Sequence, residues 1–406
     1  MPFDYAPHFR TGLPAAAGRW SGYPDFNFVG GHNDADSIPV AGLLAAAQAV
    51  IEREGEQLAL YGLDSGPMGY RPLRDFIAAK LAKRAGMTVD PETVLVTSGS
   101  LQALDLVNAV FLAPGDTVVI EDACYGGTIT RFQRLGVRYV GVPVDEDGMD
   151  THALAATLDA LKAEGVRPKF IYTIPTVQNP TGTVMTRERR LELLRLAAEH
   201  DLPIFEDDCY ADLLWEGERP PALHALDTDG RVIYCGSFSK TVAPALRVGY
   251  LIAPWPVMGQ AMPLKTDAGS GALEQMVLGE WAPNNFDAHV ERLKGALRAK
   301  ADATVAALEE QFGAAAEFLQ PRGGIFLWVT LPDAVDTTRL AEAAAAEGVA
   351  VNPGAEWVAD PDTGRHRIRI CFAHPSAEDL RTGIAKLAEI CHREFGVPMR
   401  SANVPR

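Results

Sequence analysis

One lysine lies among hydroxyl-bearing residues at the point where a buried strand is expected to end. Lys240 follows Ser237 and Ser239 and precedes Thr241, directly after the apolar run 232–235. An amine held away from water has a lowered pKa and can attack an aldehyde. A lysine at a strand end can also extend its ammonium group into solvent, and this segment alone favours that simpler interpretation.

Three carboxylates follow another apolar run. Glu206, Asp207 and Asp208 come directly after residues 203–205, and Tyr210 lies two positions further on. Acidic residues at a strand end often cap a helix or occupy a solvated turn. Alternatively, one carboxylate in the crevice beyond the strand could pair with a cationic ring nitrogen.

Small residues lie between a third apolar run and a helical pattern. Ser98, Gly99 and Ser100 follow residues 93–97 and precede the helical pattern that starts at Leu101. Free N–H groups and the helix dipole at such a point can bind a phosphate. Serine is also a common helix cap, so this segment alone is a weak signal.

The order and spacing of these clusters match a known family. The sequence resembles the fold-type-I pyridoxal-phosphate enzymes of the class I/II aminotransferase family, in the branch that includes 2-aminoadipate and kynurenine aminotransferases and the catalytic half of MocR-type regulators. The resemblance extends from about Phe26 to the last predicted helix. It rests on Asn179-Pro180-Thr181-Gly182, Asp207-x-x-Tyr210, Ser237-x-Ser239-Lys240 and Arg247, a combination more specific than any single motif.

The resemblance implies a role for each matching residue at the cofactor, pyridoxal 5′-phosphate. Lys240 would be the catalytic residue, carrying the cofactor as an internal aldimine and moving the substrate α-proton. Asp207 would keep the ring nitrogen protonated, so that the ring accepts electrons. Asn179 and Tyr210 would hydrogen-bond the phenolic oxygen, and Tyr125 would stack on the ring.

The resemblance also implies how the phosphate and the substrate are held. Tyr61 would reach the phosphate bound by the partner subunit of a homodimer. Arg369 would bind the substrate α-carboxylate through its planar guanidinium group, with Asn179 and Gly31 also at the substrate. The remaining cofactor-binding residues would surround the phosphate; they are Gly99, Ser100, Leu101, Ser237, Ser239 and Arg247.

Two residues depart from the family pattern. Leu101 stands where many relatives carry Gln, which keeps the main-chain N–H but removes a side-chain contact. Cys209 stands before Tyr210, where Pro or Ala is common. Neither change removes an essential group, and both could alter cofactor electronics or substrate scope.

A scaffold of alternating strands and helices is predicted to position these residues. This alternation predicts an α/β fold whose mostly parallel, mixed sheet has helices on both faces. Such sheets bind ligands beyond the carboxyl ends of their strands. The predicted strands are 93–97, 117–121, 139–142, 170–173, 203–205, 232–235 and 248–252, with helices at 101–111, 151–162 and 187–199 among them.

The chain is long enough for more than one domain. We predict an N-terminal arm that contributes to the small domain (1–45), a large cofactor-binding domain (46–285) and a small α+β C-terminal domain (286–406). The small domain is predicted to contain a long helix from about 285 to 312, a strand at 325–331, and helices at 338–347 and 377–395.

Composition excludes several classes of partner. A formal net charge of −16 without any Lys/Arg run argues against nucleic acid. No apolar stretch approaches the roughly 20 residues of a membrane span. The nine histidines are dispersed, so no metal site is predicted. Five scattered cysteines favour a reducing compartment, and the chain is expected to be cytoplasmic.

The leading interpretation is a ping-pong aminotransferase acting on an amino acid and a 2-oxo acid, although the sequence identifies neither. One alternative keeps the cofactor but changes the reaction to that of a lyase, racemase, cyclase or oxidase, because one fold hosts many activities. A more remote alternative is the regulatory half of a MocR-type factor. That alternative requires an upstream helix-turn-helix domain, whereas only a short arm precedes the predicted fold.

Overall fold

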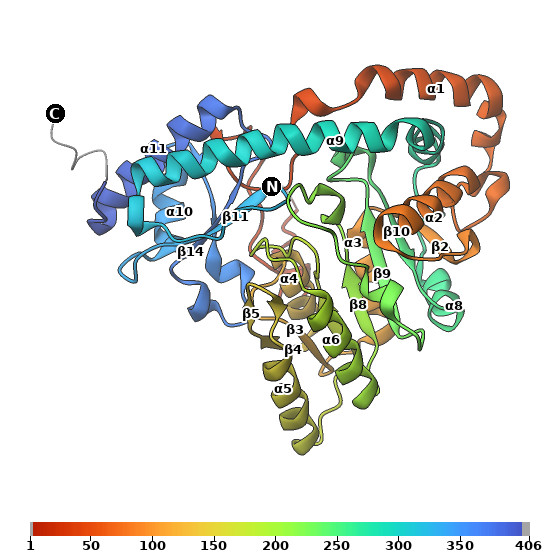
Figure 1. Ribbon diagram of the computed structural model, residues 1–406, viewed down its shortest axis with the longest axis horizontal. Coiled ribbons are helices and arrows are strands. Elements are labelled where there is room, and N and C mark those ends of the chain that lie inside the picture. The colour runs from red at the N-terminus through yellow and green to blue at the C-terminus, as the bar shows by residue number, and fades with distance from the viewer. Residues whose placement is uncertain (1–2, 400–406) are drawn as a thin grey trace.

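A seven-stranded sheet forms the centre of the computed structural model, which describes residues 3–399 (Figure 1). Its strands are β2 (Val94–Ser98), β3 (Thr117–Glu121), β4 (Arg138–Val142), β7 (Ile171–Thr173), β8 (Ile204–Asp207), β9 (Val232–Ser237) and β10 (Val248–Ile252). They lie in the order β2-β10-β9-β8-β7-β3-β4. Only β10 is antiparallel to its neighbours, so the predicted mixed, mostly parallel sheet is confirmed.

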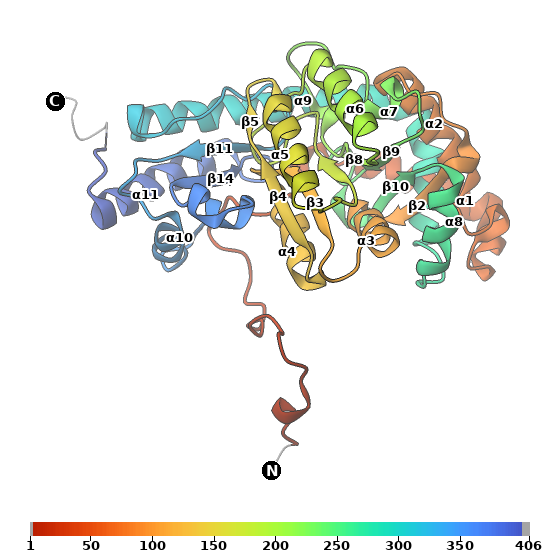
Figure 2. The same ribbon diagram turned by 90° about the horizontal axis from the view of Figure 1, so that it is seen from below.

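Helices cover both faces of this sheet (Figure 2). One face carries α3 (Ser100–Phe111), α4 (Gly126–Leu135) and α8 (Trp255–Leu264); the other carries α2 (Arg71–Ala85), α5 (Thr151–Ala163), α6 (Arg187–Glu199) and the start of α9 (Ala272–Gln311). Because successive strand side chains point to opposite faces, Leu95 packs in the core beside α3, whereas Val94 and Val96 pack in the core beside α2. The sequence pattern did not predict α4 or α8, which contain Gly-Gly and Pro residues that weaken a helical signal.

The C-terminal part of the chain forms a second, smaller layer. Its antiparallel sheet contains β11 (Phe326–Thr330), β14 (Arg367–Cys371) and β13 (Asn352–Pro353), with α10 (Thr337–Ala345) and α11 (Ala377–Phe395) beside it. β1 (Phe26–Asn27) pairs in parallel with β12 (Val349–Ala350). Residues just after the exposed arm therefore join this layer. The remaining α-helices and strands are α1 (Val40–Glu54), α7 (Leu223–Leu226), β5 (Val144–Asp145) and β6 (Gly148–Met149).

Helix α9 extends along both layers (Figure 1). Its predicted start near residue 285 is wrong, because the helix begins at Ala272. Pro283 lies inside it, and a proline, which lacks the backbone N–H, usually interrupts such a pattern. The predicted domain boundary between residues 285 and 286 therefore falls within a continuous helix, and the division into domains stays a prediction.

The first described residues extend away from the body of the molecule (Figure 2). Residues 3–23 are all exposed. Between residues 3 and 399, no helix is both long enough and apolar enough to cross a membrane.

Candidate functional site

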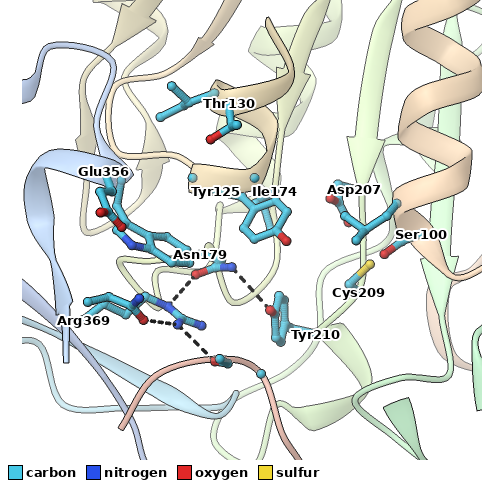
Figure 3. Close-up of a pocket in the computed structure, with 18 of the residues that line it drawn as sticks. Ser100, Tyr125, Thr130, Ile174, Asn179, Asp207, Cys209, Tyr210, Glu356 and Arg369 are labelled. Carbon is cyan, nitrogen blue, oxygen red and sulfur yellow. Dashed lines mark hydrogen bonds between the residues drawn. The ribbon is translucent and has the colours of Figure 1, made fainter. Parts of the chain in front are cut away.

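The carboxyl ends of β7, β8 and β9 and the N-terminus of α3 open onto one cavity of about 740 Å³ (Figure 3). Most of the predicted site residues line it: Gly31, Ser100, Leu101, Tyr125, Asn179, Asp207, Tyr210, Ser237, Ser239, Lys240, Arg247 and Arg369. Gly99 lies just behind this wall, because a Cβ there would come within 2.3 Å of Arg247 Nη2. Tyr61 does not line the cavity of its own chain and is 85% exposed.

Lys240 lies in the turn that follows β9. Its Nζ donates a hydrogen bond to the carbonyl oxygen of Gly31 over 2.7 Å. A Cβ on Gly31 would lie 2.3 Å from that nitrogen, so a larger residue at this position would displace the end of the lysine side chain. Burial, with a further contribution from the charge of Arg369, lowers the pKa of Lys240 to about 8. The neutral, nucleophilic amine is therefore accessible near neutral pH.

Asp207 is the only one of the three clustered carboxylates that faces the cavity. Glu206 accepts hydrogen bonds from the backbone N–H groups of Leu223 and His224, and Asp208 accepts one from Tyr234. The alternation of side chains along β8 accounts for this division. The three neighbouring carboxylates therefore have different roles, because the strand directs their side chains to different sides.

The two oxygens of Asp207 have different environments. Oδ2 accepts a hydrogen bond from the Tyr172 hydroxyl over 2.8 Å, and that hydroxyl accepts one from Thr128 over 3.2 Å. Oδ1 is buried and has no hydrogen-bond partner among the described residues. Burial raises the pKa of Asp207. A buried carboxylate oxygen without a partner is costly, and a protonated ring nitrogen would satisfy it.

The side-chain amide of Asn179 links Tyr210, in the segment after β8, to Arg369 on β14. Its Nδ2 donates to the Tyr210 hydroxyl over 3.3 Å, and its Oδ1 accepts from Arg369 Nε over 3.0 Å (Figure 3). The Arg369 guanidinium lies between the rings of Phe326 and Trp357, 4.4 and 4.3 Å from their centroids. This stacking holds a buried cation from β14 in a fixed orientation at the cavity wall.

Donors converge at the opposite end of the cavity. Helix α3 begins after Gly99, which has φ +73°, and no side chain caps its first turn. Ser237 Oγ accepts a hydrogen bond from the backbone N–H of Ser239 over 3.0 Å. Arg247 has φ +54°, a left-handed conformation that is strained for a non-glycine residue, and its Nη2 donates to the carbonyl oxygen of Ser98 over 3.1 Å. These groups form an end of the cavity that can bind an anion.

The donor set fits pyridoxal phosphate. The α3 N-terminus, the two serines and Arg247 would hold the phosphate, and Asp207 Oδ1 would take the ring nitrogen. Lys240 is placed to reach the aldehyde. Tyr125 lines the cavity beside Trp357, with ring centroids 5.8 Å apart, and could lie against the ring face.

Several residues of this site were not singled out from the sequence. Tyr172 and Trp357 lie in apolar surroundings that resemble ordinary core. Glu121 is fully buried and accepts hydrogen bonds from Thr173, the backbone of Ile174 and Gln178 over 2.6, 3.2 and 2.9 Å. This arrangement holds the segment that leads into Asn179. Its burial raises the pKa of Glu121 to about 7. No motif marks such a group, because its role depends on which strands lie side by side.

Known proteins share both the sequence pattern and the fold. The profile of the family described as aminotransferase class I and II matches residues 32–387. The aromatic-amino-acid aminotransferase 1 of Thermococcus litoralis is 34% identical over 372 residues, covering 91% of this chain and 88% of that protein. The 2-aminoadipate transaminase of Thermus thermophilus is 35% identical over 366 residues, covering 89% of this chain and 88% of that protein. The kynurenine aminotransferase of Pyrococcus horikoshii, solved in complex with PMP, superposes with a TM-score of 0.85 at 33% identity and 91% coverage of both chains.

Proposed function

Since the chain belongs to the class I and II aminotransferase family, and is a pyridoxal-phosphate-dependent aminotransferase, we propose that Lys240 is its catalytic amine and the residue that holds the cofactor. The observation that carries this assignment is the position of Lys240 Nζ. This nitrogen lies at the cavity, where it donates a hydrogen bond to the carbonyl oxygen of Gly31. Burial lowers the pKa of the amine to about 8. An amine of that pKa can act as both base and acid near neutral pH.

The surrounding residues divide the work of binding and orientation. When bound, pyridoxal phosphate supplies a ring that withdraws electrons from the substrate α-carbon. Asp207 holds the proton of the ring nitrogen at Oδ1, while Tyr172 fixes Oδ2. Asn179 and Tyr210 hydrogen-bond the phenolic oxygen. Lys240 Nζ takes the α-proton and returns it, and the cavity wall limits the access of water.

Arg369 binds the substrate α-carboxylate. Its guanidinium group offers paired N–H donors, which match two carboxylate oxygens better than an ammonium group does. Stacking between Phe326 and Trp357 and the hydrogen bond to Asn179 keep it oriented before substrate arrives. Gly31 and Asn179 lie beside the same position.

The donor amino acid carries an aromatic or extended apolar side chain. Tyr125, Trp357 and Val358 give the cavity an aromatic and apolar wall. Glu356 also lines it, burial raises the pKa of this carboxyl, and no basic side chain in the described part of the chain forms an ion pair with it. A dicarboxylic donor would bring a second negative charge to this wall, which is unfavourable. The names of two relatives, an aromatic-amino-acid and a kynurenine aminotransferase, agree with this preference, whereas the 2-aminoadipate relative does not.

The functional unit is a homodimer in the cytoplasm. Tyr61 is exposed, and so are Leu58 and Leu60 before it. The spacing of the exposed residues Val40, Leu44 and Ile51 puts them on one side of α1, and we infer that a second copy of the chain covers these apolar side chains. A patch of this kind marks an interaction site. In the dimer, Tyr61 reaches the phosphate of the partner subunit. The five cysteines are all free and buried, which suits a reducing compartment.

A half-reaction tests the proposed chemistry. The purified chain is mixed with one amino donor at a time and no acceptor, and the products are identified by mass. Aromatic donors should give one oxo acid per site together with pyridoxamine phosphate, and 2-aminoadipate should react far more slowly. A lyase, racemase, cyclase or oxidase reaction would release a different product or leave no pyridoxamine phosphate. A screen of 2-oxoglutarate and pyruvate then identifies the acceptor.

A further inference from the structure

Two thiols lie beside Asp207 at the wall of the cavity. Cys209 is two residues beyond Asp207, and Cys235 is the residue paired with Asp207 between β8 and β9. One carboxylate oxygen of Asp207 and the two sulfur atoms all lie within 4.8 Å of one another. Cys209 lines the cavity, with its sulfur on the side of Asp207 (Figure 3).

This group has the composition of a site for a thiophilic cation. Two thiolates and a carboxylate oxygen are ligands that Zn²⁺ binds, and sites with three protein ligands keep a fourth position for water. The open position would face the cavity, because Cys209 lines it. The dispersed histidines gave no hint of such a site, since its ligands are sulfur and oxygen atoms that the pairing of β8 with β9 brings together.

The surroundings of Asp207 also favour a ligand at this point. Its Oδ1 is buried without a partner among residues 3–399, so a ligand at this point would remove an unsatisfied acceptor. Its Oδ2 accepts the hydrogen bond from Tyr172 over 2.8 Å. Carboxylates that ligate metals are themselves oriented by hydrogen bonds of this kind.

We propose that Asp207, Cys209 and Cys235 bind one Zn²⁺ ion when the cofactor is not in place, and that metal and cofactor exclude each other. Binding converts two thiols to thiolates: Zn²⁺ gains two Zn–S bonds and one Zn–O bond, and two protons pass to solvent. No oxidant is required. Metal and cofactor exclude each other because the same carboxylate would hold the ring nitrogen of the cofactor. Metal binding of this kind goes beyond the aminotransferase function proposed above.

Cobalt provides a direct spectroscopic test on the full chain. The cofactor is removed, the thiols are kept reduced with a phosphine, and Co²⁺ is added as a probe of the zinc site. We expect thiolate-to-cobalt charge-transfer absorption that saturates at one equivalent and disappears when Zn²⁺ is added. Titration with Zn²⁺ in weak buffer should release close to two protons per ion.

Matched variants locate the site. Cys209→Ser and Cys235→Ser should each lose most of the charge-transfer absorption, whereas Cys391→Ser, a buried thiol on α11 outside the group, should keep it. Tyr172→Phe should bind Zn²⁺ about tenfold more weakly. If a serine variant fails to fold, Asp207→Asn provides the same test at the third ligand. Unchanged binding in the Cys209 and Cys235 variants, or no binding by the parent chain, would overturn the proposal.

Competition between pyridoxal phosphate and the bound metal ion tests whether the two exclude each other. Adding pyridoxal phosphate should release the bound cobalt and remove its absorption, and the cofactor-loaded chain should bind less than a tenth of an equivalent. Simultaneous binding of both would overturn the exclusion. These measurements need no turnover, so their failure is distinguishable from a failure of the half-reaction.

Discussion

Tyr172 donates a hydrogen bond to Asp207 Oδ2 over 2.8 Å from a strand that carries no recognised motif. A hydrogen bond to a charged group contributes about 1.5–3 kcal/mol. Tyr172→Phe should therefore weaken cofactor binding by roughly 10- to 100-fold, because Asp207 loses the contact that orients it. Cofactor affinity is measured by absorbance during dilution.

Tyr139→Phe is a matched control for this change. Tyr139 accepts a hydrogen bond from Gln133 at the molecular surface, so its loss should leave cofactor affinity unchanged. Equal affinities for the Tyr172 variant and the parent chain would show that Asp207 is held by its strand alone.

The pKa of Lys240 predicts how fast the cofactor-free chain takes up its cofactor. Burial lowers this pKa to about 8, so the amine is mostly protonated below that pH and mostly neutral above it. The rate of covalent attachment should rise about tenfold per pH unit while the pH is below about 8, and it should level off above that pH. The rate is followed by absorbance, and Lys240→Ala should show no covalent attachment after borohydride reduction.

A model amine separates this effect from the titration of the cofactor itself. N-acetyl-lysine amide has an ordinary pKa of about 10.4, so its reaction should keep rising with pH beyond the point at which the protein levels off. Parallel profiles for the two amines would contradict a lowered pKa, and a reduced label on another lysine would move the assignment away from Lys240.

Much of the large sheet could be predicted from hydrophobic patterns, because its strands are buried and bounded by turn residues. The strands at 117–121 and 248–252 and the helices at 187–199 and 377–395 have the bounds predicted for them. The start of α9 could not be predicted, since Pro283 argues locally against a helix that tertiary packing nevertheless stabilises.

The site residues also fall into two groups: those that a short sequence motif marks, and those whose roles depend on contacts between distant parts of the chain. Short motifs mark Lys240, Asp207 and Asn179 at strand ends or in the loops that follow strands, and the sheet brings these segments to one cavity. The contacts of Tyr172 and Trp357, and the grouping of Cys209 with Cys235 beside Asp207, could not be found in this way, because they arise between elements far apart in the chain. The sequence of an apolar strand does not indicate which polar atom a side chain on that strand will contact.

A buried ion pair beneath the site should contribute to stability. Lys80 Nζ lies 2.7 Å from Asp212 Oδ2, and both side chains are buried. Breaking a buried pair leaves an uncompensated charge and costs about 3–5 kcal/mol. We expect Lys80→Met to cost about 3 kcal/mol, near the lower end of that range, because Arg219 also pairs with Asp212 over 2.9 Å. Lys83→Met on the same helix, whose pair with Asp287 is exposed, should cost less than about 1 kcal/mol.

The difference in the free energy of unfolding between the parent chain and Lys80→Met should depend on pH with a defined sign. Burial alone would raise the pKa of Asp212, but the charges of Lys80 and Arg219 lower it to about 2. A lowered carboxyl pKa stabilises the folded state above the unfolded pKa of about 3.9. The gap between the parent chain and Lys80→Met should therefore be constant near neutrality and shrink as pH falls from about 4 toward 2. Thermal unfolding across this range measures it, and a gap independent of pH would contradict the assignment.

Removing Arg369 should impair substrate recognition and leave the cofactor in place. Loss of one partner from a desolvated charge pair costs roughly 2–5 kcal/mol. Arg369→Ala should therefore lower kcat/KM by roughly 30-fold to several thousand-fold, and Arg369→Lys should recover part of the loss. Arg367→Ala, two residues earlier on β14, is the matched control. If Arg369→Ala released the cofactor, or if Arg367→Ala had the larger effect, carboxylate binding would belong to another residue.

Mixing two defective chains should restore activity if each site draws Tyr61 from the partner subunit. Tyr61 is 85% exposed and absent from the cavity of its own chain, so a role at the phosphate requires a second copy. In a mixed dimer of Tyr61→Phe and Lys240→Ala chains, one site has both residues intact and the other has neither. Because random reassociation makes half of the dimers mixed in a twofold-symmetric assembly, activity should recover to about a quarter of the parent value. The assay is run at a cofactor concentration that saturates the parent chain but not the Tyr61 variant. If Tyr61 served its own subunit, every site in the mixture would keep one defect and no activity would return, and a fully active monomer in light scattering would contradict the shared site directly.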